Sequence, residues 1–109
     1  MALTHTRPGD PVDVQPMGSR LATEPTKALF KSDQLELIRL VLQAGKSFPP
    51  HQVLGEITIH CIEGEIDVTV DGESHILKAG QLLFLKGGTQ HGVTALQDAS
   101  ALVTIVLKP

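Results

Sequence analysis

The chain has 109 residues, of which 41% are hydrophobic and 19% are charged, and this length suffices for one globular domain with a single core. Nine Lys and Arg residues stand against twelve Asp and Glu residues, and the net charge is −3. This is the wrong sign for a protein that binds a phosphate backbone or an anionic lipid surface. We therefore expect neither nucleic acid nor membrane as a partner.

Cysteine content and hydropathy bear on the cellular location. Cys61 is the only cysteine, so the chain forms no intrachain disulfide bond. The N-terminal region carries no apolar run of signal-peptide length, and no stretch approaches the roughly 20 apolar residues that a membrane span needs. A cytoplasmic protein is the resulting expectation.

Residues 1–26 are predicted to form an extended N-terminal arm. They hold four of the seven prolines and show neither helical nor strand periodicity. Because proline fixes φ and lacks an N–H group, we expect at most a short, interrupted edge strand at residues 12–14 and an otherwise loose segment.

Residues 27–109 are predicted to form an all-β domain, since short β-branched runs alternate with Gly, Asp-Gly or Pro-Pro at intervals of roughly ten residues. The clearest strand is 65–70, where apolar and polar residues alternate, and Asp71-Gly72 after it favours a tight type I′ hairpin turn. The return strand is predicted at 73–77. Leu35–Leu42 is apolar on both faces, which is typical of an inner strand or a subunit interface.

Further strands are expected at 81–85, 91–96 and 101–107, which brings the total to about eight. So many strands without helices between them favour closure into a barrel or a two-sheet jelly roll, because closure removes exposed sheet edges.

Two stretches resemble the paired motifs of the cupin superfamily, the small RmlC-like jelly-roll barrels, also described as double-stranded β-helices. The first family motif reads G-x5-H-x-H-x3-4-E-x6-G, and residues 45–51 match its opening while 62–65 resemble its ending. The second reads G-x5-P-x-G-x2-H-x3-N, and residues 80–91 match its glycines and its histidine. The resemblance covers residues 35–107 and implies the cupin fold for the domain.

The departures from these motifs concern the metal ligands. Metal-binding cupins hold one divalent ion with three histidines and a glutamate. This chain has Val53 at the second histidine position and Ile57 at the glutamate position, so the resemblance leaves only His51 and His91. Lys86 replaces the proline of the second motif and Ala95 its asparagine.

A divalent metal held by imidazole usually needs three or more protein ligands, or two His and a carboxylate. A third donor is available in Glu56 if a β-bulge beside Gly55 turns its carboxylate inward; otherwise Glu56 faces outward. His60 is too far along the strand to join it and is expected to face outward. The predicted cofactor is a divalent transition metal (Fe, Mn, Ni, Zn or Cu) that is weakly bound or absent.

The interior ligand pocket is predicted to be mostly aliphatic. The other interpretation of His51 and His91 is that of leftover interior histidines with satisfied ring nitrogens. Gln52 beside His51 is either a ligand contact or a solvated loop residue, and Cys61 is expected to be a small buried residue rather than a nucleophile. His75 is assigned to the surface and His5 to the arm. The candidate pocket residues are Gln52, Val53, Ile57, Ile59, Cys61, Val93 and Ala95.

Two functions remain open from the sequence. The first is a cupin that binds a metal, a small organic molecule or both inside the barrel. If it is an enzyme, it is a metal-dependent oxygenase, isomerase or decarboxylase, with no catalytic residue assigned. The second is a non-catalytic, metal-free binding or sensing module that acts through a dimer. In either case the apolar 35–42 strand and the arm favour a homodimer.

Overall fold

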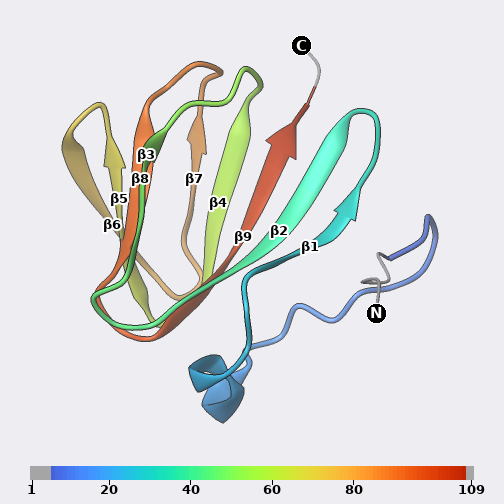
Figure 1. The fold of residues 1–109 in the computed structure, drawn as a ribbon, viewed down its shortest axis with the longest axis horizontal. Coiled ribbons are helices and arrows are strands. Elements are labelled where there is room, and N and C mark those ends of the chain that lie inside the picture. Colours follow the sequence, from blue (N-terminus) through green and yellow to red (C-terminus); the bar gives the residue numbers. More distant parts are fainter. Residues whose placement is uncertain (1–5, 108–109) are drawn as a thin grey trace.

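The computed structural model describes residues 6–107 and consists of two antiparallel β sheets that face each other (Figure 1). One sheet has five strands in the order β1-β2-β9-β4-β7, and the other has four in the order β3-β8-β5-β6. The predicted all-β jelly-roll fold is therefore confirmed. The elements are η1 (Gly18–Ala22), β1 (Lys27–Lys31), β2 (Leu35–Leu42), β3 (Ser47–His51), β4 (Ile57–Glu63), β5 (Glu65–Val70), β6 (Glu73–Lys78), β7 (Leu82–Leu85), β8 (His91–Ala95) and β9 (Ala99–Val106).

The core lies between the sheets and follows from the alternation along their strands. In β4 the side chains of Ile57, Ile59 and Cys61 are buried while the residues between them are more exposed. In β5 the same alternation buries Ile66 and Val68. Apolar side chains at every second position thus give each sheet one hydrophobic face, and the two faces pack together.

The hairpin between β5 and β6 forms as the sequence predicts. Asp71 and Gly72 have φ values of 50° and 85°, the left-handed conformations that a type I′ turn needs at both central positions. The strands pair in register from Glu65 with Lys78 to Val70 with Glu73. The prediction of this strand pair from local pattern alone is confirmed.

Leu35–Leu42 is an inner strand, as expected, because β2 lies between β1 and β9. Other strand limits differ by a few residues: β9 begins at Ala99 rather than 101, and β8 ends at Ala95 rather than 96. The described residues contain nine strands rather than about eight. The edge strand β3 includes Pro49 and Pro50, which is possible because only one side of an edge strand requires hydrogen bonds.

The arm differs from its prediction. Over residues 6–26 no strand forms at 12–14, and the 3-10 helix η1 interrupts the extended chain. Nor is this segment loose, because it returns along the outer side of the five-stranded sheet (Figure 1). The N–H of Thr6 donates to the Leu29 carbonyl at 2.9 Å. His5 and the last two residues, 108–109, lie outside the described part of the chain.

A buried polar network holds the arm to the outer face of this sheet. The Glu63 carboxylate accepts hydrogen bonds from the N–H groups of Met17 (2.8 Å) and Gly18 (3.0 Å) and from the Ser100 hydroxyl. The Arg39 guanidinium, 3% exposed, lies 3.4 Å from Glu63 and donates to the Gln15 carbonyl at 2.7 Å. The sequence pattern showed none of these partners, because they lie far apart in the chain.

The protonation of Glu63 reflects these contacts. Burial raises the pKa of Glu63, but the hydrogen bonds from Ser100, Met17 and Gly18 and the charge of Arg39 outweigh it, so the pKa lies below its usual range. The ionised carboxylate is therefore the form that anchors the arm.

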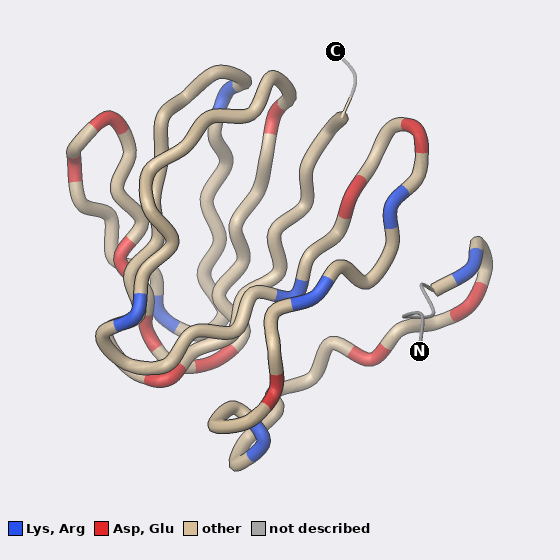
Figure 2. Tube along the Cα trace, viewed as in Figure 1, with Lys and Arg blue, Asp and Glu red and all other residues tan. Residues whose placement is uncertain are grey.

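Charged residues lie mostly in the arm, at strand ends and in turns, whereas β4, β7 and β9 carry few or none along their length (Figure 2). The interior between the sheets is consequently almost free of formal charge. No helix in residues 6–107 is long and apolar enough to cross a membrane.

Candidate functional site

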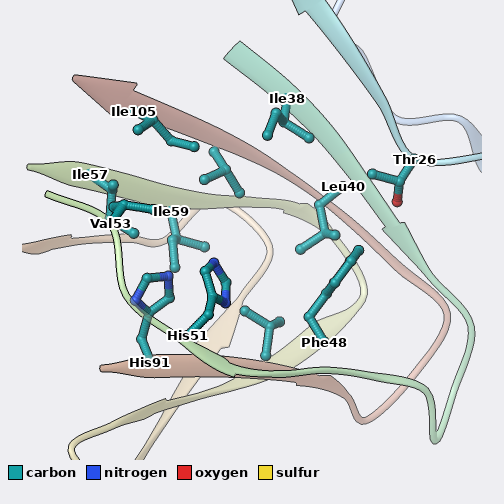
Figure 3. Close-up of a pocket in the computed structure, with 12 residues that line it drawn as sticks. Thr26, Ile38, Leu40, Phe48, His51, Val53, Ile57, Ile59, His91 and Ile105 are labelled. Carbon is teal, nitrogen blue, oxygen red and sulfur yellow. The ribbon is translucent and has the colours of Figure 1, made fainter. Parts of the chain in front are cut away.

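A cavity of about 170 Å³ lies between the two sheets near His51 and His91 (Figure 3). Nine of its twelve lining side chains are hydrocarbon, and the other three are Thr26, His51 and His91. The five-stranded sheet contributes Ile38, Leu40, Ile57, Ile59, Val103 and Ile105; the four-stranded sheet contributes Phe48, His51, His91 and Val93; Thr26 and Val53 come from the segments before β1 and after β3.

The two histidines meet because β3 pairs with β8. His51 and His91 are register partners, with ring centroids 4.5 Å apart and ring planes at 52°. His91 is 4% exposed because β8 lies inside the sheet between β3 and β5, whereas His51 is exposed because β3 is an edge strand. Figure 3 shows both rings projecting into the cavity toward Ile57 and Ile59. One imidazole is therefore deep and the other is accessible from solvent.

Backbone carbonyls fix the tautomer of both rings. The Nδ1 of His51 lies 3.2 Å from the Pro49 carbonyl oxygen, and that of His91 lies 3.0 Å from the Thr89 carbonyl oxygen. Because a carbonyl oxygen only accepts, each Nδ1 carries the hydrogen, and in the neutral ring each Nε2 carries a lone pair. No residue in 6–107 hydrogen-bonds to either Nε2. Two unused acceptors thus sit beside one another in an apolar cavity.

The predicted pocket residues divide into two groups. Val53, Ile57, Ile59 and Val93 line the cavity, whereas Gln52, Cys61 and Ala95 do not. Gln52 is exposed in the loop after β3. Cys61 and Ala95, 0% and 1% exposed, share the inward faces of β4 and β8 but are packed in the hydrophobic core farther along these strands.

Cys61 does not have the surroundings of a nucleophile. Burial raises the pKa of its thiol, and the negative charges of Glu63 and Glu65 raise it further, although a hydrogen bond to the Glu63 carbonyl opposes the shift. The thiolate, which is the reactive form, is disfavoured there.

Glu56 is not brought to the histidines. Glu56 is exposed and lies just before β4, and its backbone carbonyl accepts a hydrogen bond from the N–H of Val106. Glu56 is also not among the residues that line the cavity. Among residues 6–107 no group of three or more His, Cys, Asp or Glu side chains is placed to hold a metal ion.

The other two histidines in the described part of the chain, His60 and His75, lie away from the cavity. His60 alternates with the inward-facing Ile59 and Cys61 and so belongs to the outer face, as expected. The exposed His75 lies 3.2 Å from the Glu73 carboxylate.

Half of the lining was missed from the sequence. Ile38 and Leu40 alternate within β2, and Val103 and Ile105 within β9, so the sequence marks them as one face of a strand. That this face borders the histidines depends on strand pairing across the chain. Phe48 lies within the recognised first motif, and Thr26 reaches the cavity because its hydroxyl is bonded to the backbone of Val41 (2.8 and 3.0 Å).

The profile of the cupin domain family matches residues 38–107. The chain belongs to the cupin family. An RmlC-like cupin from Desulfovibrio desulfuricans, known from a crystal structure, shares 30% sequence identity with this chain. The two structures match with a TM-score of 0.69 over 74% of this chain and 79% of that chain. No curated protein matches.

Two other solved structures share the fold over nearly the whole chain. A cupin superfamily protein from Desulfitobacterium hafniense is 17% identical (TM-score 0.78, 99% of this chain and 100% of that chain). A conserved protein of unknown function from Streptococcus pyogenes is 18% identical (TM-score 0.77, 100% and 99%). Cupins commonly bind metals or small molecules, so the cavity is the natural candidate site in this member.

Proposed function

We propose that this cupin binds a small organic molecule inside its barrel, with the polar group of the ligand held by His51 and His91. One observation carries the proposal: both Nε2 atoms are left without a protein partner, in residues 6–107, at the wall of an apolar cavity. The side chain of His91 is buried, and buried polar side chains are nearly always hydrogen-bonded, so an unused acceptor that opens onto the cavity favours a bound partner there.

The donor set does not fit a tightly held metal. Two imidazoles fall short of the three or more protein ligands that such an ion usually has, and aliphatic Val53 and Ile57 occupy the other two ligand positions of the family motif. We therefore propose that a divalent transition metal is weakly bound or absent.

A metal-dependent oxygenase, isomerase or decarboxylase is the second candidate function. The 4.5 Å distance between the two ring centroids favours it, because both rings project into the same cavity. Elemental analysis of the untagged protein, purified without chelator, separates the two candidates. Near-stoichiometric metal that is lost in both His51→Ala and His91→Ala would support the metal-dependent enzyme.

The proposed assembly is a homodimer through the outer face of the five-stranded sheet. Leu82 and Phe84 lie on this face, because they pair with the outward-facing His60 and Thr58, and they are 58% and 56% exposed. Large exposed apolar side chains on one sheet face favour association with a second copy. A cytoplasmic location, expected from the lone cysteine, stays a prediction.

A thermal-shift screen against a library of small metabolites tests ligand binding directly. We expect one chemical class to raise the melting temperature of the wild type and of His60→Ala, whose histidine is on the outer face. The same compounds should have little effect on His51→Ala and His91→Ala. If stabilising compounds act equally on all four proteins, the cavity is not the binding site.

A further inference from the structure

We infer that the ligand is an uncharged, mostly apolar molecule that carries one hydrogen-bond donor, such as a hydroxyl or N–H group, at one end. This inference deepens the proposed function and rests on it. It follows from the inventory of polar atoms that the cavity presents.

The polar side chains of the lining offer acceptors and no free donor. The Thr26 hydroxyl donates to the Val41 carbonyl (3.0 Å) and accepts the Val41 N–H (2.8 Å), so its single donor hydrogen is used within the protein. The Nδ1–H groups of His51 and His91 are used by the carbonyls of Pro49 and Thr89. The two Nε2 lone pairs remain, and a lone pair binds only a donor or a cation.

This inventory excludes two common classes of ligand. A carboxylate or phosphate requires N–H or O–H donors, or a positive charge, and the lining side chains provide neither in their neutral form. A sugar carries many hydroxyl groups, and most of them would lose their water against hydrocarbon without a new partner. An apolar body with a single donor satisfies both the lining and the histidines.

The cavity volume limits the size of the buried part. An engineered apolar cavity of about 150 Å³ binds benzene, so a cavity of about 170 Å³ holds a body of roughly six to ten non-hydrogen atoms. Phe48, on the edge strand β3, lines the cavity and is 38% exposed.

Four small molecules that differ in their hydrogen-bonding groups and charge test the inference. Uniformly ¹⁵N-labelled protein is titrated at pH 8 with phenol, anisole, benzoate and glucose, and the amide signals of Ile59 and Val93 are followed by NMR. Phenol carries a donor, anisole has the same ring without one, benzoate is an anion and glucose is a polyol. We expect phenol to shift both signals, anisole to bind about tenfold more weakly, and the other two to leave the signals unchanged.

Two variants assign the donor preference to the histidines. In His91→Leu the phenol-to-anisole preference should fall to about one, and in His51→Leu, at the exposed mouth and so less able to disturb folding, it should fall in the same direction. His60→Leu should keep it. The amide spectrum of each variant reports whether the fold is intact.

The outcomes separate the inference from the proposed function. If benzoate or glucose shifts these signals more strongly than phenol, the barrel binds small molecules but the ligand class is wrong. Equal binding of phenol and anisole by the wild type overturns the inference in the same way. If none of the four probes shifts either signal at millimolar concentration, both the inference and the proposed function fail.

Discussion

Glu63→Gln is expected to destabilise the protein and release the arm. The substitution keeps the shape of the side chain but removes the charge opposite Arg39, which is 3% exposed. Breaking a buried ion pair on one side costs about 3–5 kcal/mol, because the remaining charge stays buried without its partner. The Glu63 side chain is 13% exposed, and an amide oxygen can still accept from Met17 or Gly18, so we expect a loss somewhat below this range, about 2–3 kcal/mol.

Thermal unfolding followed by circular dichroism measures this effect, since the chain has no Trp or Tyr for fluorescence. For a domain of this size the loss corresponds to a decrease in melting temperature of roughly 10–20 °C. The matched control is Glu65→Gln, because Glu65 has no side-chain hydrogen bond or ion pair within residues 6–107. It should change the melting temperature by only about 2 °C or less.

Release of the arm has a separate readout in trypsin cleavage after Arg20, which lies in η1 and has an exposed side chain. Cleavage there requires local opening of the arm, and its rate should rise in Glu63→Gln and not in Glu65→Gln. If both variants unfold and are cleaved like the wild type, the network does not anchor the arm and the reasoning is wrong.

The same network predicts a pH dependence. The pKa of Glu63 is lower in the folded protein than in the unfolded chain, so its contribution to stability is complete above the unfolded value of about 4.3 and is lost as the pH falls through the folded value. Wild-type stability should therefore decrease more steeply than that of Glu63→Gln below about pH 4. If the urea midpoints of the wild type and of Glu63→Gln change in parallel from pH 6 to pH 2.5, the inferred direction of the pKa shift is wrong.

Three further predictions follow from the cavity, the outer face and the backbone. The double variant Val53→His/Ile57→Glu should gain tight binding of one Zn²⁺ ion by calorimetry, because it restores two donors beside the histidine pair; no gain would show that donor number is not what limits metal binding. Phe84→Lys should convert the proposed dimer to a monomer in light scattering at micromolar concentration, and a wild type that is already monomeric would contradict the proposed interface. Gly64→Ala should lower the urea midpoint far more than Gly80→Ala. Both glycines have positive φ, but only at Gly64 would an added Cβ lie 2.2 Å from a carbonyl oxygen. Equal midpoints for the two variants would contradict the close packing of the turn at Gly64.

The parts of the fold that depend on neighbouring residues could be predicted from the sequence. The alternation in 65–70 and the Asp71-Gly72 pair define a hairpin locally, and the structure confirms it. The limits of β9 were less accurate, because Ala99 and Ser100 join the strand through pairing with residues 41 and 42 of β2, and Ser100 also with Glu63 of β4. The sequence carries no local sign of that pairing.

For the site, the sequence could predict which residues take part but not how they are arranged. The motif resemblance singled out His51 and His91, but their 4.5 Å spacing comes from β3–β8 pairing between segments that are far apart in the chain. Their tautomers depend on the carbonyls two residues before each, Pro49 and Thr89, whose direction follows from the local backbone conformation. The arm anchor was missed for a similar reason, since Glu63 is 46 residues from Met17.

The two polar clusters of this cupin differ in how completely the protein provides their hydrogen-bond partners. At the outer face, Glu63, Arg39 and Ser100 bond to one another and to the arm, and only the Nε of Arg39 lacks a partner among the described residues. At the cavity, each histidine uses one ring nitrogen for the backbone and leaves the other unused. A polar group that only supports the fold is expected to be satisfied by the fold itself. In the Glu63 network nearly all polar atoms have a protein partner, whereas in the histidine pair only one of the two ring nitrogens of each residue has one. A bound ligand is therefore the best explanation for the position of the histidine pair.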